Sequence, residues 1–268
     1  MPQQELADFW ESAACGEAQY LPSLTADGYN FEGAERYRLE PEILAFAEFS
    51  RWSGKNVLEI GVGLGADHQR FAEAGAIVTG IDLTERAIGR ARHRLEIFGL
   101  RSQLQVGDAE SLPFPDASFD LAYSWGVIHH TPRTDLAARE ILRVLRPGGE
   151  FRVMVYNRYS IIGLMLWLRY GHRCGFSLSE CYSRFLESPG TKTYTPSQAA
   201  ELFHGAVNIK TQVVLTHGDL LASDAGQRHR SAVLKITRAI WPRWLLKRFA
   251  SQRGLFLLVS GQKPLKTA

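Results

Sequence analysis

The order of apolar and polar positions along residues 55–156 predicts short strands that alternate with helices. Apolar runs with β-branched residues occupy 55–60, 76–82 and 103–106, a length and composition typical of buried strands. Helices are expected at 66–74, 84–98 and 134–146; in the second, Ala87, Ala91 and Leu95 recur at helical spacing and mark a core face. Because strands and helices alternate at short intervals, the pattern predicts a parallel sheet with helices on both faces.

The segments that flank this core are expected to be helical additions to one domain spanning residues 1–268. Residues 1–50 are rich in aromatic side chains and predict a helical cap. Residues 157–206 predict an insertion that ends in a helix, which begins with a capping box at Thr195 and proline at the first helical position. Strands follow at 210–216 and 255–260. A structureless connection as long as the one between these two strands is uncommon, so residues 218–253 are predicted to be a basic helical insertion.

The first strand runs into a turn with glycines at alternate positions, Gly61, Gly63 and Gly65. Glycine tolerates positive φ and has no Cβ, so a ligand can lie against the backbone at the start of the next helix. The spacing differs from that of a dinucleotide site, and Glu59 inside the strand would repel a pyrophosphate but attract a cation. A nucleoside-like, positively charged ligand is therefore expected, and S-adenosylmethionine fits that description.

Further motifs follow the glycine turn in order. The second strand ends in Asp82, where nucleotide-binding α/β folds place an acid that accepts hydrogen bonds from the ribose hydroxyls. The third strand ends in a G-D-A-E segment, residues 107–110, which places Asp108 to meet an adenine amino group, and L-P-F follows at 112–114. Residues 118–130 end in His129 and His130, and residues 144–150 turn a helix into another strand. Together these segments, within residues 37–156, resemble the small-molecule branch of the class I S-adenosylmethionine-dependent methyltransferases.

The resemblance implies a Rossmann-like α/β fold with a mostly parallel seven-stranded sheet, whose last strand is antiparallel and belongs to a terminal hairpin. Residues 55–156 would form the cofactor-binding core. The glycines would admit the methionine end of the cofactor, Glu59 would bind its ammonium group, and Asp82 would bind its ribose. The remaining cofactor-binding residues implied by the resemblance are Tyr37, Leu83, Asp108, Ala109 and Glu110, together with Ser124 and Trp125, whose backbone would close over the methionine.

His129 and His130 are the best-placed candidates for a catalytic base, because imidazole titrates near neutrality and both lie just past the fourth strand. Methyl transfer from a sulfonium mainly requires alignment of the nucleophile, so a base is needed only when the nucleophile carries a proton of high pKa. The same histidines could instead shape the loop through hydrogen bonds. The other histidines lack metal-ligand spacing, so no metal is expected.

Charge is divided unevenly along the chain. Residues 228–268 hold ten Lys or Arg and no Asp or Glu, whereas the rest of the chain holds 21 basic and 28 acidic side chains. In the segment 228–253 cations are interleaved with aromatic residues, as in interfacial helices. It is expected to seal a pocket or to dock on a partner subunit of a homo-oligomer, and peripheral membrane contact is the alternative. Nucleic-acid binding is not favoured, because no recognition module accompanies the charge.

The acceptor is expected to be a small, partly apolar metabolite bound beyond the carboxyl ends of the strands, under the aromatic cap and the insertion. A nucleic-acid or lipid methyltransferase and a non-catalytic S-adenosylmethionine-binding protein are the alternatives. A dehydrogenase is disfavoured by Glu59 and by the glycine spacing. The polar N-terminus has no signal-peptide pattern and no apolar run approaches 20 residues, so a soluble, cytoplasmic protein is expected.

Overall fold

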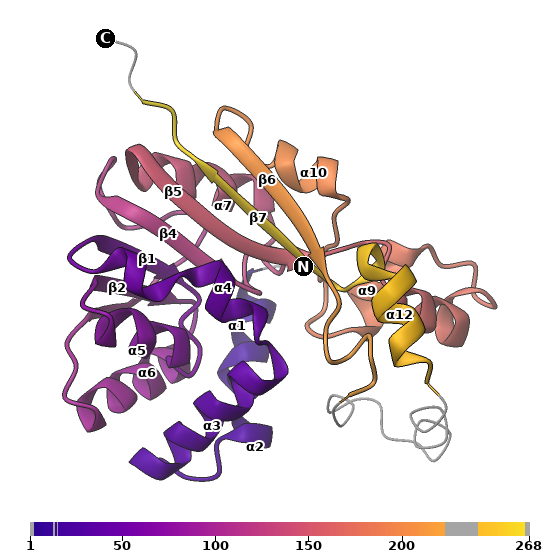
Figure 1. Cartoon of the computed structure of the whole chain (residues 1–268), viewed down its shortest axis with the longest axis horizontal. Coiled ribbons are helices and arrows are strands. Elements are labelled where there is room, and N and C mark those ends of the chain that lie inside the picture. Colours follow the sequence, from indigo (N-terminus) through magenta and orange to yellow (C-terminus); the bar gives the residue numbers. More distant parts are fainter. Residues whose placement is uncertain (1–2, 13, 15, 223–240, 266–268) are drawn as a thin grey trace.

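The computed structural model of the chain describes residues 3–12, 14, 16–222 and 241–265. Its centre is a seven-stranded sheet in the order β3-β2-β1-β4-β5-β7-β6 (Figure 1). The strands are β1 (Asn56–Ile60), β2 (Ile77–Asp82), β3 (Gln103–Val106), β4 (Phe119–Trp125), β5 (Leu145–Tyr156), β6 (Val207–Val214) and β7 (Phe256–Gln262). The first five strands pair in parallel, and β7 is antiparallel to both β5 and β6. The predicted α/β sheet with an antiparallel last strand is therefore confirmed.

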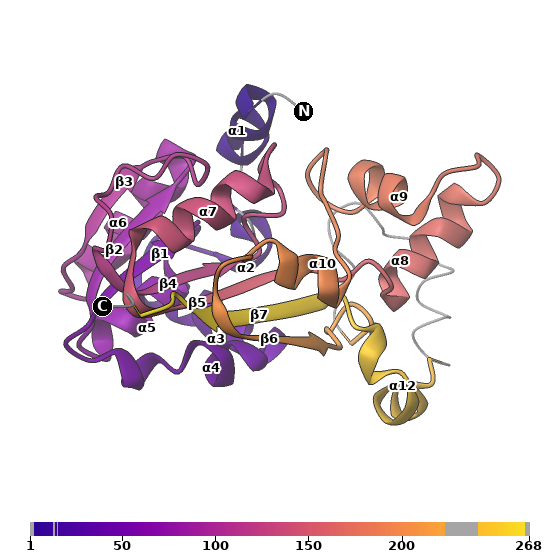
Figure 2. The ribbon, with the colours of Figure 1, turned by 90° about the horizontal axis from the view of Figure 1, so that it is seen from above.

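Helices cover both faces of the sheet (Figure 2). On one side lie α5 (Ala66–Glu73) and α6 (Glu85–Ile97), and on the other lie α7 (Thr134–Val144) and α10 (Pro196–Glu201). The two faces of β1 contribute to two different hydrophobic clusters. Leu58 belongs to the cluster that includes residues of α7, whereas Val57 belongs to the cluster that includes Phe71 of α5. Neighbouring strand residues point to opposite faces, so β1 carries apolar side chains on both of its faces.

Four helices precede the sheet: α1 (Gln3–Ser12), α2 (Glu17–Tyr20), α3 (Ala26–Leu39) and α4 (Glu42–Ala47), followed by the 3-10 turn η1 (Phe49–Trp52). The helix predicted from Pro41 to about Phe49 ends early, because Glu48 has a left-handed backbone with φ of 50°. Thr25 caps α3 by accepting a hydrogen bond from the backbone of Gly28. These elements form the helical N-terminal segment that the sequence predicts.

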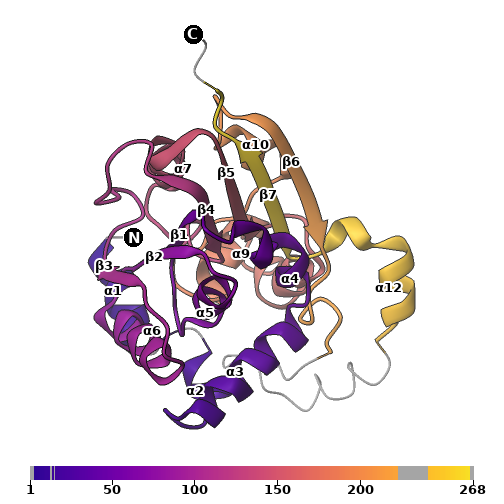
Figure 3. The ribbon, with the colours of Figure 1, turned by 60° about the vertical axis from the view of Figure 1, so that its left-hand side comes forward.

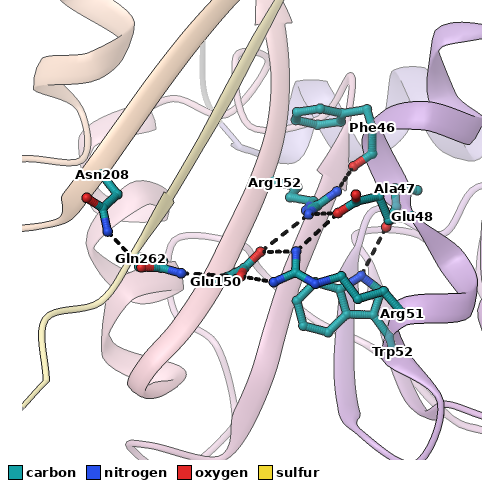
Figure 4. A network of polar contacts seen from close by, with 9 residues as sticks. All are labelled: Phe46, Ala47, Glu48, Arg51, Trp52, Glu150, Arg152, Asn208 and Gln262. Carbon is teal, nitrogen blue, oxygen red and sulfur yellow. Dashed lines mark hydrogen bonds and ion pairs between the residues drawn. The ribbon is translucent and has the colours of Figure 1, made fainter.

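A polar network joins this N-terminal segment to the sheet (Figure 4). Arg152 of β5 donates to the carbonyl of Phe46 and pairs with Glu48. Arg51 pairs with Glu150, which also accepts from Gln262 of β7 at 3.3 Å. Both guanidinium groups lie over the ring of Trp52, at 4.9 and 5.6 Å from its centre. The network holds η1 against β5 and β7.

The additions after β5 are α8 (Ile161–Leu166), the π-turn η2 (Trp167–Gly171) and α9 (Leu178–Phe185). The capping box predicted at Thr195 is present at the start of α10. Between β6 and β7, α12 (Arg243–Phe249) and the 3-10 turn η3 (Ser251–Arg253) are helical, and α12 stands apart from the sheet (Figure 3). The part of the predicted basic insertion at 223–240 lies outside the described residues. None of the described helices has the length and apolar character needed to span a membrane.

Candidate active site

A cavity opens at the carboxyl ends of β1, β2, β4 and β5, at the edge where the sequence places the glycine turn. Ten of the residues predicted for the site line it: Glu59, Gly61, Gly63, Gly65, Asp82, Leu83, Asp108, Ala109, Trp125 and His130. They lie at or after the ends of β1, β2, β3 and β4, which are separated by helices in the sequence but adjacent in the sheet. The sheet order, and not sequence proximity, brings them together.

The glycine turn has left-handed backbone at all three positions, with φ of 83° at Gly61, 51° at Gly63 and 80° at Gly65. A Cβ at Gly61 would lie 2.1 Å from a methyl carbon of Val127, and one at Gly65 would lie 3.1 Å from Ala91. Only the Cβ of Gly63 would meet no described atom within 4 Å. Two glycines are thus required for protein packing as well, while Gly63 leaves open space beside the cavity.

Glu59 is buried at the end of β1, and its Oε2 lies 2.8 Å from Nδ1 of His68. The other nitrogen of His68 lies 2.6 Å from the hydroxyl of Ser102, which donates its own proton to the carbonyl of Val78. Toward His68, the hydroxyl of Ser102 can therefore only accept, so Nε2 of His68 carries a proton. The short contact between Nδ1 of His68 and Oε2 of Glu59 requires a second proton between these two atoms. Burial raises the pKa of Glu59, which favours that shared proton.

Asp82 ends β2 and turns both carboxylate oxygens toward backbone donors. It accepts from the amide of Gly63 at 3.1 Å and from the amide and hydroxyl of Thr84 at 3.2 and 3.0 Å. Burial raises its pKa despite these hydrogen bonds. A carboxylate accepts about four hydrogen bonds, so Asp82 fixes the glycine turn and retains capacity for a ligand hydroxyl. Asp108 similarly accepts from the amide of Glu110 at 2.8 Å.

Arg36 and Asp67, which the sequence analysis did not single out, join the N-terminal segment to the glycine turn. Asp67 lies in the first turn of α5 and accepts two hydrogen bonds from Arg36, at 3.0 and 2.6 Å. The hydroxyls of Tyr37 and Tyr123 also donate to it, at 3.0 and 2.9 Å. Burial alone would raise the pKa of Asp67, but the charge of Arg36 and these hydrogen bonds outweigh burial and lower it. Both Arg36 and Asp67 line the cavity.

Four residues expected in the site do not line the cavity: Tyr37, Glu110, Ser124 and His129. Tyr37 instead supports Asp67, and Glu110 accepts from the backbone amide of Arg133. Ser124 is fully buried within β4, one position before Trp125, so its side chain points to the opposite face of the sheet and a role for its backbone stays a prediction. His129 is fully buried, with its ring 4.1 Å from the rings of both His130 and Tyr156.

His130, unlike His129, faces the cavity. Its Nδ1 lies 2.7 Å from the hydroxyl of Ser188 and 3.1 Å from that of Thr191. Thr191 donates its hydroxyl proton to the carbonyl of Ser188, so toward His130 it can only accept. Nδ1 of His130 therefore donates to Thr191 and carries the ring proton. In the neutral ring the lone pair is then on Nε2, and this atom lies 3.5 Å from Oε2 of Glu187. Burial lowers the pKa of His130, which keeps the ring neutral near pH 7.

The rest of the cavity is aromatic and acidic. Its lining includes Trp125, Met154, Tyr156 and Phe256 at the ends of three strands, and the carboxylates of Glu40 and Glu187. Residues of α1, among them Leu6 and Trp10, complete the lining, and the ring of Trp10 lies 5.6 Å from that of His130. The N-terminal segment and the insertion after β5 therefore both border the cavity, as the sequence predicts. Among the described residues, no cluster of His, Cys, Asp or Glu is arranged to hold a metal.

Comparison with known proteins agrees with this architecture. Residues 58–153 match the family described as a methyltransferase domain. The chain is 43% identical over 100 residues to a fatty-acid O-methyltransferase of Mycolicibacterium smegmatis, a match that covers 37% of this chain and 36% of that protein. It is 32% identical over 152 residues to a demethylmenaquinone methyltransferase of Tropheryma whipplei, covering 51% of this chain and 62% of the relative. The chain thus spans less than two thirds of the length of these curated relatives.

Solved structures share the fold across most of the chain. A phosphoethanolamine N-methyltransferase of Haemonchus contortus aligns with a TM-score of 0.61 at 19% identity, over 89% of this chain and 58% of that one. The cyclase SpnF aligns with a TM-score of 0.55 at 21% identity, over 88% and 82%. At such identities the likeness shows the fold alone. Residues 58–153, which include the glycine turn, therefore form a methyltransferase domain that resembles the class I S-adenosylmethionine-dependent enzymes.

Proposed function

We propose that the protein transfers the methyl group of S-adenosylmethionine to a small, partly apolar acceptor. The observation that carries this proposal is that one cavity has two parts with different chemistry. The part beside Gly63, Asp82 and Asp108 offers a bare backbone and carboxylates, which suit the cationic nucleoside cofactor. The part beside Trp125 and Tyr156 offers apolar rings at the ends of adjacent strands, which suit a partly apolar acceptor.

When bound, the cofactor supplies an activated methyl group on a sulfonium, so the protein has to orient the acceptor and exclude water. Glu59 would bind the cofactor ammonium, Asp82 the ribose hydroxyls and Asp108 the adenine. The buried walls around Trp125, Tyr156 and Phe256 would keep water from the acceptor. Where the acceptor carries a proton, His130 is the candidate base, because it faces the cavity with a neutral ring, whereas His129 is enclosed behind it.

Binding and turnover can be tested separately. Calorimetry with S-adenosylmethionine and S-adenosylhomocysteine should show binding to one site, and NAD should show none. Methyl transfer from radiolabelled cofactor to a mixed panel of amines, alcohols, carboxylic acids and quinols should then identify turnover. Cofactor binding without turnover on any class would favour a non-catalytic binding protein. Failure to bind either cofactor form would refute the proposed function.

The exposed surface of α12 supports a second proposed function, contact with a membrane surface. Trp244 and Phe249 are 70% and 73% exposed, and Lys247 and Arg248 accompany them on the same short helix. Exposed aromatic rings beside cations favour contact with an anionic membrane surface, through which a lipid-like acceptor would arrive. Flotation with anionic and with neutral vesicles, using the chain and its W244S/F249S variant, tests this role. Equal flotation of both proteins would exclude it, and a change in oligomeric state of the variant would indicate a subunit contact instead.

A further inference from the structure

Three aromatic rings form one wall of the cavity. Trp125 and Tyr156 are the last residues of β4 and β5, and Phe256 is the first residue of β7. Phe256 pairs in register with Tyr156 across the two antiparallel strands, and their rings are nearly parallel at 6.2 Å. The ring of Trp125 meets Phe256 edge to face at 5.5 Å. The register of the sheet therefore places these rings side by side where β4 and β5 end and β7 begins.

Trp125 and Tyr156, the two outer rings of this wall, each donate a hydrogen bond to a carboxylate. The indole N–H of Trp125 donates to Oε2 of Glu40 at 2.9 Å, and the hydroxyl of Tyr156 donates to Oε2 of Glu187 at 2.7 Å. Both carboxylates line the cavity, with side chains 19% and 31% exposed. Oε2 of Glu40 also lies 3.7 Å from Arg36, and Oε2 of Glu187 also lies 3.5 Å from Nε2 of His130. Glu40 is the residue that follows α3, and Glu187 belongs to the insertion after β5.

The charges around the cavity leave this end negative. Arg36 is the only Lys or Arg among the described lining residues, and it is bound through two nitrogens by Asp67, at 3.7 Å from Glu40. His130 is neutral near pH 7, since burial lowers its pKa. Burial raises the pKa of Glu40, whereas the charge of Arg36 and the hydrogen bond from Trp125 oppose that shift and favour the carboxylate. A carboxylate ligand would be repelled here, and a cation would be attracted.

We propose that this end of the cavity selects a primary or secondary amine with an apolar body as the methyl acceptor. The inference rests on the proposed function and names the acceptor class of that same site. The protonated nitrogen would lie between Glu40 and Glu187, against the faces of the aromatic wall, because aromatic rings and carboxylates together favour an ammonium group over a neutral or anionic one. The apolar body would contact the rings and Met154.

A primary amine would react as its free base. The bound ammonium would give up one proton to His130 or Glu187, which both line the cavity, and the proton would then pass to water. The nitrogen lone pair forms a bond to the methyl carbon, and the carbon–sulfur bond breaks with its electron pair left on sulfur. The products are a methylated ammonium ion, neutral S-adenosylhomocysteine and one released proton. The two carboxylates stabilise a positive nitrogen before and after transfer.

Calorimetry on the complex with S-adenosylhomocysteine tests the acceptor site without the sulfonium charge. The probes are matched series on one skeleton: phenylalkyl and alkyl amines, the corresponding alcohols and the corresponding carboxylates. We expect amines to bind at least about 10-fold more tightly than their matched alcohols, the ratio expected from one charge-assisted hydrogen bond. Glu40→Gln and Glu187→Gln should each weaken amine binding by roughly 10-fold while leaving S-adenosylhomocysteine affinity unchanged. Unchanged cofactor affinity also shows that these variants are folded.

Glu201→Gln is the matched control, because Glu201 is an exposed glutamate of α10 outside the cavity. It should leave amine binding unchanged. A panel in which no amine binds more tightly than its matched alcohol and carboxylate overturns the inference, as does full amine affinity in both glutamine variants. Methyl transfer to alcohols, carboxylates or carbon acceptors in that case would leave the proposed function standing. Absence of S-adenosylhomocysteine binding would instead remove the proposed function itself.

Discussion

Replacing Asp67 by asparagine should be the most damaging single polar change near the site. The Asp67 side chain is 1% exposed and accepts four hydrogen bonds, two of them from Arg36. Asparagine keeps one acceptor oxygen but turns an amide NH₂ toward donors, and it leaves the Arg36 guanidinium with only the more distant Glu40, at 3.7 Å, as a counter-ion. Removing one partner of a buried ion pair costs about 3–5 kcal/mol. Because Arg36 remains 27% exposed, we expect the lower end, about 3 kcal/mol.

Urea denaturation followed by fluorescence measures this loss, and for a chain of this size about 3 kcal/mol corresponds to a fall in Tm of roughly 6–12 °C. Asp116→Asn is the control, because Asp116 is 76% exposed and its pair with Arg143 lies at the surface; its change should stay within about 0.5 kcal/mol. Adding Arg36→Met to Asp67→Asn should recover part of the loss, since it removes a charge that has lost its nearer partner. A loss below about 1 kcal/mol for Asp67→Asn would refute the reasoning.

The same residue gives a pH dependence. The pKa of Asp67 is lowered in the folded chain, so its contribution is fully present above its unfolded pKa of about 3.8. The contribution is lost as the pH falls below that value and toward the lowered folded pKa. Stability of the wild type should therefore fall more steeply than that of Asp67→Asn in this acid range. Parallel pH series of the two proteins that fall equally would contradict the assignment.

Three further changes probe the site itself. Asp82→Ala should weaken S-adenosylmethionine binding by about 1.5–3 kcal/mol, the range for hydrogen bonds to a charged group, and wild-type affinity in calorimetry would refute its role. Gly63→Val should weaken binding further, because a branched residue is strained at φ of 51° and its side chain would occupy the open space beside the cavity. His130→Gln should keep cofactor affinity and slow turnover about 10²–10⁴-fold if His130 is the base. The wild-type rate would then rise with pH over a range below pH 6.5, the ordinary histidine value, and a pH-independent rate would leave alignment as the whole mechanism.

The local sequence was sufficient for the elements whose signals lie within a few residues. The glycine turn, the acid that ends β2, the capping box at Thr195 and the alternation of strands with helices could all be predicted. Each depends on backbone conformation or on side-chain periodicity, which neighbouring residues determine. The ends of elements were less accurate: β6 runs from Val207 to Val214, whereas the pattern predicted 210–216.

The tertiary structure decided which of the candidate residues share the cavity. His129 and His130 are neighbours in sequence, yet only His130 lines the cavity, because the loop buries the other ring against Tyr156. Tyr37 was expected at the cofactor, but its hydroxyl reaches Asp67, 30 residues further along. Arg36, Glu40 and Glu187 carry no motif. Their roles arise from the packing of α3 and of the insertion against strand ends, and contacts between such distant segments leave no periodic signal in a single sequence.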